Sequence, residues 1–310
     1  MAFSLFGSRT ILGVDLGTSG VKIIEMSRGV GGRFELKNYG ILDFIPKDKN
    51  DTPKLDDKIL INGLKELLAK TKFSTKNVVA SISSFLTFAT VIEMPYLSEK
   101  DLGKAIPFEA RKYIPVPLDQ VILDWSIINV KQAGDHPNVE VFLAAVPKDE
   151  TERYKNIFIS SGLNLKALEL ENIALARTFA ADDFMPLVIA NLGGRSSSIV
   201  VIDGGFERVS RNYEVGGFQL SKALTEALGV SFEKADEIKK EEGLKSNSSG
   251  FASMAPLVDL IIFETKSKQS LSLICLDSIS ERTIWFTEAK NFLISHFKAQ
   301  TVFWEVVHLK

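Results

Sequence analysis

Three short runs of apolar residues open the chain, and glycine-rich turns separate them. Strand-like alternation and β-branched content mark residues 11–15, 21–27 and 34–43. Turns are predicted at residues 17–20 and 29–32, which favours an antiparallel meander. The apolar spacing then becomes helical over residues 56–70 and strand-like again over residues 78–82. The opening is therefore predicted to be β-β-β-α-β.

A small α+β module is predicted next. Ser98 precedes Glu99 and Asp101, acidic residues typical of a first helical turn, so Ser98 is the expected N-cap of a short helix. Pro107 is expected to kink or restart that helix. The other predicted elements of the module are strands over residues 88–94, 121–130 and 139–146 and a helix over residues 148–161.

The opening pattern recurs later in the chain. After a helix predicted over residues 169–181, three strands are predicted over residues 187–191, 198–203 and 206–215. Gly204-Gly205 supplies the two-residue turn that a tight hairpin requires. Two helices follow, over residues 218–228 and 231–242, the second capped by Ser231. This recurrence predicts two related half-molecules.

Two turns occupy matching positions in these halves. Aligning Asp15 with Asn191 also places Gly17 on Gly193. Backbone N–H groups of such a strand-turn-strand point into one concavity, where an anion can bind. A carboxylate beside a polyphosphate needs a cation between them, so Asp15 is an expected Mg²⁺ ligand through water. Either turn alone is an ordinary hairpin turn, and it is the pair that predicts a bound polyphosphate.

Composition narrows the class of protein. The 310 residues exceed the roughly 250–300 at which one hydrophobic core stops growing, so two domains are expected. The net charge of −2 and the lack of basic runs with interleaved aromatic residues argue against nucleic-acid binding. Cys275 is the only cysteine, which excludes a disulfide within the chain and favours a reducing compartment. We identify no secretory signal and no apolar run of the ~18 residues that a spanning helix needs.

Residues 271–310 differ from the rest of the chain. They contain no Gly or Pro but hold two of the three Trp, two of the three His and the only Cys. Forty residues of a β-rich domain without Gly or Pro are unusual. We interpret this tail as altered, for example by a shifted reading frame, and a genuine terminal helix is the alternative.

The turn motifs resemble those of a known superfamily. Gly-Val-Asp15-Leu-Gly-Thr-Ser, the later Gly193-Gly194-Arg-Ser-Ser and the pair Gly216-Gly217 are similar to motifs of the actin, Hsp70 and sugar-kinase superfamily. The predicted module carries Glu93-Met-Pro-Tyr-Leu-Ser98 and Glu109-Ala-Arg-Lys-Tyr-Ile-Pro115, which resemble the PilM family of type IV pilus assembly, a relative of FtsA. The resemblance runs from about residue 3 to residue 242 and is most specific in the module.

The resemblance implies an α/β actin-like ATPase fold, with two ribonuclease-H-like halves, a small α+β inserted subdomain and a truncated or altered C-terminal part. The implied division is the first half or subdomain 1A (1–84), the inserted subdomain 1C (85–165), a return to subdomain 1A (166–185), the second half (186–270) and the atypical tail (271–310).

The resemblance also implies the site residues. Asp15 and Asn191 stand at the catalytic positions, and Asp15 is the metal position. The implied nucleotide-binding residues are Gly17, Thr18, Ser19 and Lys22 of the first phosphate loop, Gly193, Gly194, Ser196 and Ser197 of the second, Gly216 and Gly217, and the pair Asp236 and Lys239 for the ribose and base. From their spacing alone, Asp236 and Lys239 are read as a solvated salt bridge on one helix face.

Two departures from the family pattern modify these expectations. Asn191 stands where the family has Asp, and an amide cannot take a proton, so hydrolysis should suffer more than binding. The Gly-Gly turn implied under the adenine after residue 270 is missing from residues 271–310. At most a weak ATPase is expected, and nucleotide affinity is expected to be reduced.

The implied function is a cytoplasmic scaffold at the inner face of the membrane, acting in pilus assembly and cell motility. It would bind ATP and Mg²⁺ and recruit the N-terminal segment of the inner-membrane protein PilN to a groove between subdomains 1A and 1C, near residues 85–94 and 108–113. Self-association is a further expectation. A sugar or acetate kinase, with Glu169 or Glu171 as the base, and a nucleotide-free adaptor are the alternatives.

Overall fold

A five-stranded sheet organises the first of two compact units. The computed structural model describes residues 10–29, 34–44, 56–132, 137–179, 187–243, 250–266 and 304–308. The strand order of this sheet is β3-β2-β1-β4-β8. Its strands are β1 (Thr10–Leu16), β2 (Gly20–Arg28), β3 (Phe34–Asp43), β4 (Asn77–Ile82) and β8 (Asn164–Leu170). The meander of β1, β2 and β3 is confirmed, since both pairings are antiparallel.

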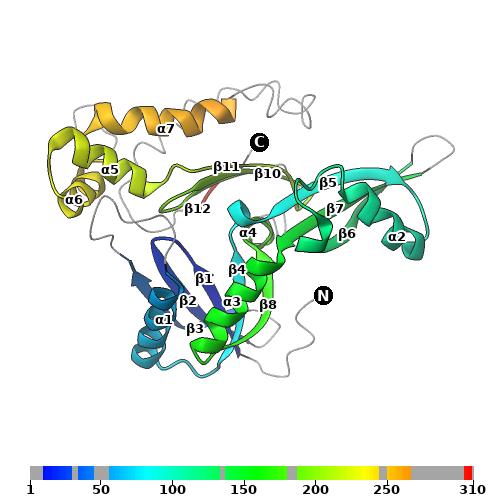
Figure 1. Ribbon diagram of the computed structural model, residues 1–310, viewed down its shortest axis with the longest axis horizontal. Helices are drawn as coiled ribbons and strands as arrows, with labels where there is room; N and C mark the ends of the chain where they lie inside the picture. Colours follow the sequence, from blue (N-terminus) through cyan, green and yellow to red (C-terminus); the bar gives the residue numbers. More distant parts are fainter. Residues whose placement is uncertain are drawn as a thin grey trace. The chain divides into compact units, whose positions relative to one another are not determined.

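Three helices pack on this sheet: α1 (Asp57–Thr71), α3 (Lys148–Ser160) and α4 (Glu171–Phe179). Asp56 caps α1 by accepting a hydrogen bond from the Lys58 amide. Helices α1 and α3 contact each other and lie on the same side of this sheet (Figure 1). Leu12, Ile23 and Val78 share one face of the sheet and are buried. Gly40 belongs to that face, and a methyl group there would lie 2.8 Å from Leu67 of α1. Helix α4 contacts β4 and β8.

The predicted helix over residues 169–181 is partly wrong. Residues 164–170 form β8, which pairs in parallel with β4, and α4 begins only at Glu171. Lys, Ala, Leu and Glu in this stretch all favour helix, but pairing with a buried strand outweighs such weak propensities.

The inserted module is a three-stranded sheet with one helix. Its strand order is β5-β7-β6, from β5 (Phe88–Pro95), β7 (Asn138–Pro147) and β6 (Val121–Lys131), and its helix is α2 (Glu99–Ala110). Ser98 caps α2 as predicted, accepting from the Asp101 amide at 3.2 Å. A restart at Pro107 is wrong, because α2 continues through this residue, while a kink there stays a prediction. Burial of Ile106 and Ala110 on either side compensates for the hydrogen bond that proline removes.

The second unit contains a sheet of strand order β11-β10-β9-β12 and three helices. Its elements are β9 (Leu187–Leu192), β10 (Ser197–Asp203), β11 (Phe206–Tyr213), β12 (Trp304–His308), α5 (Gly217–Leu228), α6 (Phe232–Glu242) and α7 (Phe251–Lys266). Gly204 and Gly205 both have positive φ, as the predicted hairpin turn requires. Ser231 caps α6 as predicted, and α7 has no counterpart among the predicted elements.

The two sheets have the same order in their first three strands, β3-β2-β1 and β11-β10-β9, and differ in the strand that follows. In the first unit the strand beside β1 is β4, which runs parallel to it. In the second unit the strand beside β9 is β12, which runs antiparallel. The rest of the predicted altered tail, residues 271–303 and 309–310, lies outside the described residues. No helix in the described part of the chain is long and apolar enough to cross a membrane.

Candidate functional site

The first predicted phosphate loop lies at the end of β1. Asp15 stands opposite Lys22 on β2 and next to Ser81 on β4. The Lys22 Nζ is 3.4 Å from Asp15 Oδ2, and Ser81 Oγ is 3.5 Å from Asp15 Oδ1. The Asp15 side chain is about a third exposed (35%), so its carboxylate can meet a ligand. Sequence reasoning missed Ser81, which comes from a strand distant in the chain.

The turn itself requires glycine at both ends. A methyl group on Gly17 would lie 2.9 Å from the carbonyl oxygen of Gly20, and one on Gly20 would lie 2.6 Å from the carbonyl oxygen of Leu42. Between them, Thr18 and Ser19 are exposed at the tip of the turn. The hydroxyl groups and the close backbone therefore lie where the sequence places a phosphate loop.

The second predicted loop has the same geometry. A methyl group on Gly193 would lie 2.7 Å from the carbonyl oxygen of Ser196, three residues later. The first loop has the corresponding close approach, between Gly17 and the carbonyl oxygen of Gly20. The Gly193 amide also donates to the Ser196 carbonyl at 3.0 Å. The side chain of Ser197 is directed elsewhere, because its hydroxyl is buried and donates to the Val215 carbonyl at 2.6 Å. A ligand role remains a prediction for Ser196 and Ser197, and the Ser197 hydroxyl also ties the loop to Val215.

Asn191 differs from Asp15 in its surroundings as well as its chemistry. It is buried, and its cross-strand neighbour is Ser198 rather than a lysine. The Ser198 hydroxyl is buried without a hydrogen-bond partner among the described residues. The ion pair of the first unit is thus replaced by two uncharged side chains at the equivalent positions.

The second loop is bonded to the start of α5. The Gly217 amide donates to the Gly193 carbonyl at 3.0 Å, and the Phe218 amide donates to the Gly194 carbonyl at 2.7 Å. A methyl group on Gly216 would lie 2.6 Å from the Gly193 carbonyl oxygen. Backbone hydrogen bonds and close contact therefore hold together the four predicted glycines, Gly193, Gly194, Gly216 and Gly217.

Asp236 and Lys239 form a buried ion pair, so the prediction of a solvated salt bridge is wrong. Their closest atoms, Lys239 Nζ and Asp236 Oδ1, are 2.5 Å apart, and both side chains are less than a tenth exposed. Burial lowers the pKa of Lys239, and Asp236 only partly offsets this effect. Burial alone would raise the pKa of Asp236, but Lys239 and Lys240 outweigh it and hold that pKa below its usual value.

Arg195 is a further cation in the second loop. Its guanidinium lies over the ring of Phe218, with the Cζ atom 5.1 Å from the ring centroid. Such cation–π contacts are favourable and keep the planar group oriented. The sequence shows this arginine within the Gly-Gly-Arg-Ser-Ser motif, but its stacking on α5 could not be read from it.

A cavity of about 370 Å³ opens in the first unit, between the module and the five-stranded sheet. It is lined by Asp124, Trp125 and Ser126 of β6, Phe142 and Ala144 of β7, Val79 of β4, residues 167–170 of β8, Ile173 and Arg177 of α4, and Phe206 at the start of β11, which clusters with the first unit. Most of these side chains are apolar, and β6 is an edge strand of its sheet.

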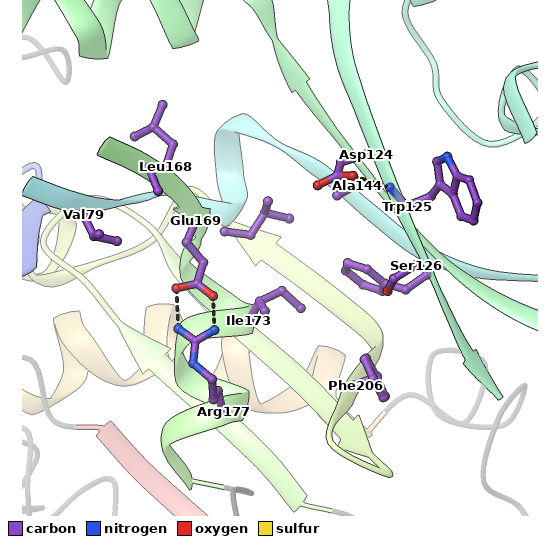
Figure 2. Close-up of a pocket in the computed structure, with 13 residues that line it drawn as sticks. Val79, Asp124, Trp125, Ser126, Ala144, Leu168, Glu169, Ile173, Arg177 and Phe206 are labelled. Atoms are coloured by element: carbon purple, nitrogen blue, oxygen red, sulfur yellow. Dashed lines mark hydrogen bonds and ion pairs between the residues drawn. The ribbon is translucent and has the colours of Figure 1, made fainter. Parts of the chain in front are cut away.

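One ion pair lies at the polar end of this cavity. Figure 2 shows Arg177 directing its guanidinium to both carboxylate oxygens of Glu169. Glu169 is also the neighbour of Ser81 across β4 and β8, so Asp15, Ser81 and Glu169 occupy adjacent strands at one level of the sheet. Glu171 accepts from the Ser84 amide at 3.5 Å. The bidentate pair occupies Glu169, which a kinase mechanism would need as a base.

No cluster of three or more His, Cys, Asp or Glu side chains suited to a metal occurs among the described residues. Asp15 at the end of β1 and Asp43, which is the cross-strand neighbour of Gly20, both bring carboxylates to the first loop. Mg²⁺ often binds through one or two carboxylates plus substrate phosphates. The donor set therefore fits a metal that arrives with a nucleotide.

Comparison with known proteins agrees with this architecture. A chain of a PilM-PilN type IV pilus biogenesis complex is 22% identical, with a TM-score of 0.68, over 82% of this chain and 75% of that one. The ethanolamine utilization protein EutJ from Carboxydothermus hydrogenoformans is 17% identical, with a TM-score of 0.53, over 96% of this chain and 85% of that one. These likenesses confirm the predicted actin-like ATPase fold.

A family model supplies the closer assignment. The model described as type IV pilus assembly protein PilM matches residues 13–266. The match includes both phosphate loops, the whole module and the buried ion pair of α6, and it ends close to the change in composition at residue 270. The chain therefore belongs to the PilM family of type IV pilus assembly proteins.

Proposed function

We propose that this chain is a nucleotide-binding scaffold of type IV pilus assembly that holds the N-terminal cytoplasmic segment of a PilN-like inner-membrane protein. The single observation that carries the proposal is the cavity between β6, β7, β8 and α4. Its place between the module and the sheet of the first half is where the sequence resemblance puts the partner groove. A related complex is described as PilM-PilN, which supports the same kind of partner.

The cavity has the properties of a peptide site. Its volume of about 370 Å³ suits a few side chains, and its lining is mainly apolar with one oriented ion pair. The free edge of β6 lies beside it, and an extended segment can hydrogen-bond to such an edge. The predicted contact residues near 85–94 and 108–113 lie in β5 and α2 or directly beside them. None of them lines the cavity, so the contact surface is proposed at β6 instead.

Nucleotide binding is proposed at the two phosphate loops. Thr18 and Ser19 are exposed at the first turn, and the second turn has the same close backbone approach. Asp15 would hold Mg²⁺ through water, and the metal would neutralise phosphate charge when bound. Asn191 offers no carboxylate for activating water, so the proposed role is binding with at most weak hydrolysis.

A peptide titration tests the partner site. A fluorophore-labelled peptide of the PilN N-terminal segment from the same organism is expected to bind the full chain, and its fluorescence anisotropy measures the affinity. Ser126→Arg fills the cavity from an exposed position on β6 and is expected to weaken binding at least about tenfold. Ile127→Arg is the matched control, since Ile127 is 41% exposed and does not line the cavity. Equal affinity of Ser126→Arg and the unmodified chain would reject this site.

A thermal-shift measurement tests the nucleotide site separately. Nucleotide at ~100 times its dissociation constant adds about 2.7 kcal/mol of stability, which raises the melting temperature measurably. An unchanged melting temperature with millimolar Mg-ATP would reject nucleotide binding and favour the nucleotide-free adaptor. Transfer of phosphate from ATP to an added sugar would favour the kinase alternative.

The proposal includes location and assembly. Binding to PilN would bring the chain to the inner face of the cytoplasmic membrane indirectly, and the scaffold would serve pilus-driven motility. Self-association of the chain is proposed as well, as a property of actin-like folds. Co-sedimentation of the chain with vesicles that carry PilN, compared with vesicles that lack it, checks the indirect attachment.

A further inference from the structure

Lys239 of α6 is a buried lysine whose three N–H donors are all directed at the protein. Its Nζ lies 3.0 Å from the Gly217 carbonyl, 2.8 Å from Ser221 Oγ and 2.5 Å from Asp236 Oδ1. An ammonium group has three donors and no acceptor. These contacts, all within the described second unit, leave no donor of Lys239 for a ribose or a base.

Gly217 connects Lys239 to the second phosphate loop. Its carbonyl accepts from Lys239, while its amide donates to the Gly193 carbonyl at 3.0 Å. The next amide, of Phe218, donates to the Gly194 carbonyl at 2.7 Å. The first turn of α5 is thus bonded on one side to a buried charge and on the other side to the loop.

We infer that Lys239 is a positioning residue that sets the geometry of the second phosphate loop through Gly217, rather than a direct contact to the nucleoside. Asp236 keeps the lysine charged and in place. Ser221, whose hydroxyl lies 2.9 Å from Asp236 Oδ1 and 3.1 Å from the Gly217 carbonyl, completes the same network.

Lys240 provides a built-in comparison. It also pairs with Asp236, with its Nζ 2.9 Å from Oδ2, but its side chain is 35% exposed against 8% for Lys239. No bond from Lys240 to Gly217 occurs among the described residues. Lys239→Met and Lys240→Met therefore each remove one cation from Asp236, and only the first removes the link to α5.

Hydrogen–deuterium exchange of the full chain, read by mass spectrometry, tests the link without a ligand. In Lys239→Met, peptides covering residues 193–196 and 215–220 are expected to exchange about tenfold faster or more, since a buried charged hydrogen bond is lost. Peptides from β9 and β10 should be unchanged, and Lys240→Met should resemble the unmodified chain. Equal acceleration throughout the second unit, or the same local change in Lys240→Met, would overturn the inference.

A binding comparison tests the consequence for phosphate, and this part rests on the proposed function. Lys239→Met should lower the affinity for ADP about tenfold while that for adenosine changes less than about twofold, because only ADP uses the loop. An equal loss for both ligands would assign Lys239 to the nucleoside instead. If the unmodified chain binds neither ligand, the proposed function fails while the exchange result still decides the positioning role.

A second variant guards against loss of folding. Ser221→Ala removes one acceptor of Lys239 and keeps both charges, so it should fold and show the same two peptides accelerating by a smaller factor. If Lys239→Met is unfolded and Ser221→Ala exchanges as the unmodified chain does, the network only stabilises the second unit. That result would reject the positioning role.

Discussion

Asp15 and Lys22 are direct cross-strand neighbours at the ends of β1 and β2, with Lys22 Nζ 3.4 Å from Asp15 Oδ2. The equivalent neighbours on β9 and β10 are Asn191 and Ser198. Both charges are therefore missing from the second unit, and not only the carboxylate. Loss of an acid together with its cation leaves a neutral, buried pair that needs no counter-ion.

Asn191→Asp is expected to destabilise the second unit at neutral pH. The new carboxylate would be buried, and its cross-strand neighbour Ser198 carries no charge, so the substitution should cost about 1–3 kcal/mol. Burial would raise its pKa, so this penalty is absent below about pH 4 and grows as pH rises. Chemical denaturation between pH 3 and pH 7 measures it.

The reverse exchange in the first unit is the control. Asp15→Asn removes a carboxylate that is 35% exposed and paired at 3.4 Å, so it should cost less than about 1 kcal/mol. Equal stability of Asn191→Asp and the unmodified chain at pH 7 would contradict the argument.

Two adjacent serines should respond in opposite ways to alanine. The Ser198 hydroxyl is buried without a hydrogen-bond partner among the described residues, so Ser198→Ala should be neutral or stabilising by up to about 1 kcal/mol. Ser197→Ala loses the 2.6 Å bond to the Val215 carbonyl and should cost about 1–2 kcal/mol. Urea denaturation of both variants decides, and a larger cost for Ser198→Ala would be inconsistent with this structure.

Local signals carried most of the fold prediction. Ser98 and Ser231 cap their helices, and Gly204-Gly205 turns its hairpin, because each depends only on a few neighbouring residues. The strand over residues 164–170 was not predicted, because β8 forms only by pairing with β4, about 87 residues earlier in the chain. Such non-local pairing leaves little trace in local propensity.

The candidate site divides in the same way. The glycines of both turns were predicted from type and spacing. Burial of Asp236 and Lys239 was not, although the signal was present: Phe232 and Ala235 place an apolar face on α6, and Asp236 and Lys239 continue that face at positions i+4 and i+7. The cavity could not be predicted, because strands and a helix from separate segments of the chain form it.

Gly216→Ala should disrupt the second loop. Its φ of −154° is open to any residue, so the constraint is space: the added methyl group would lie 2.6 Å from the Gly193 carbonyl oxygen and 2.7 Å from the Gly194 carbonyl carbon. Backbone must move to accommodate it, at a cost of about 1–3 kcal/mol. Thermal denaturation measures this cost, and any stabilisation by Mg-ATP should fall as well.

Gly217→Ala is the matched control one residue later. There the nearest atom to a methyl group is Lys239 Nζ at 3.4 Å, an ordinary contact distance, and the Gly193 carbonyl oxygen is 4.0 Å away. We expect a change within about 0.5 kcal/mol. Similar losses in both variants would show that the close approach at Gly216 does not limit the loop.

Acid should remove the contribution of the buried ion pair. The pKa of Asp236 is held below its ordinary value of 3.8 because Lys239 and Lys240 outweigh the effect of burial. A depressed carboxyl pKa contributes stability that is present above the unfolded-state value and lost as pH falls through the folded-state value. Denaturation between pH 7 and pH 2 should therefore show a loss of stability that begins near pH 4.

Asp236→Asn should abolish that part of the pH dependence. It leaves the Lys239 ammonium buried beside a neutral amide, which should cost about 3–5 kcal/mol at pH 7. Glu237→Gln is the control on the same helix, because Glu237 pairs with Lys234 at 3.0 Å on the surface, with both side chains 56% exposed, and should cost less than about 1 kcal/mol. If the free energy of unfolding falls equally with pH below about pH 4 in Asp236→Asn and in the unmodified chain, the Asp236 carboxylate is not paired with Lys239 in solution. That result would also contradict the positioning role of Lys239.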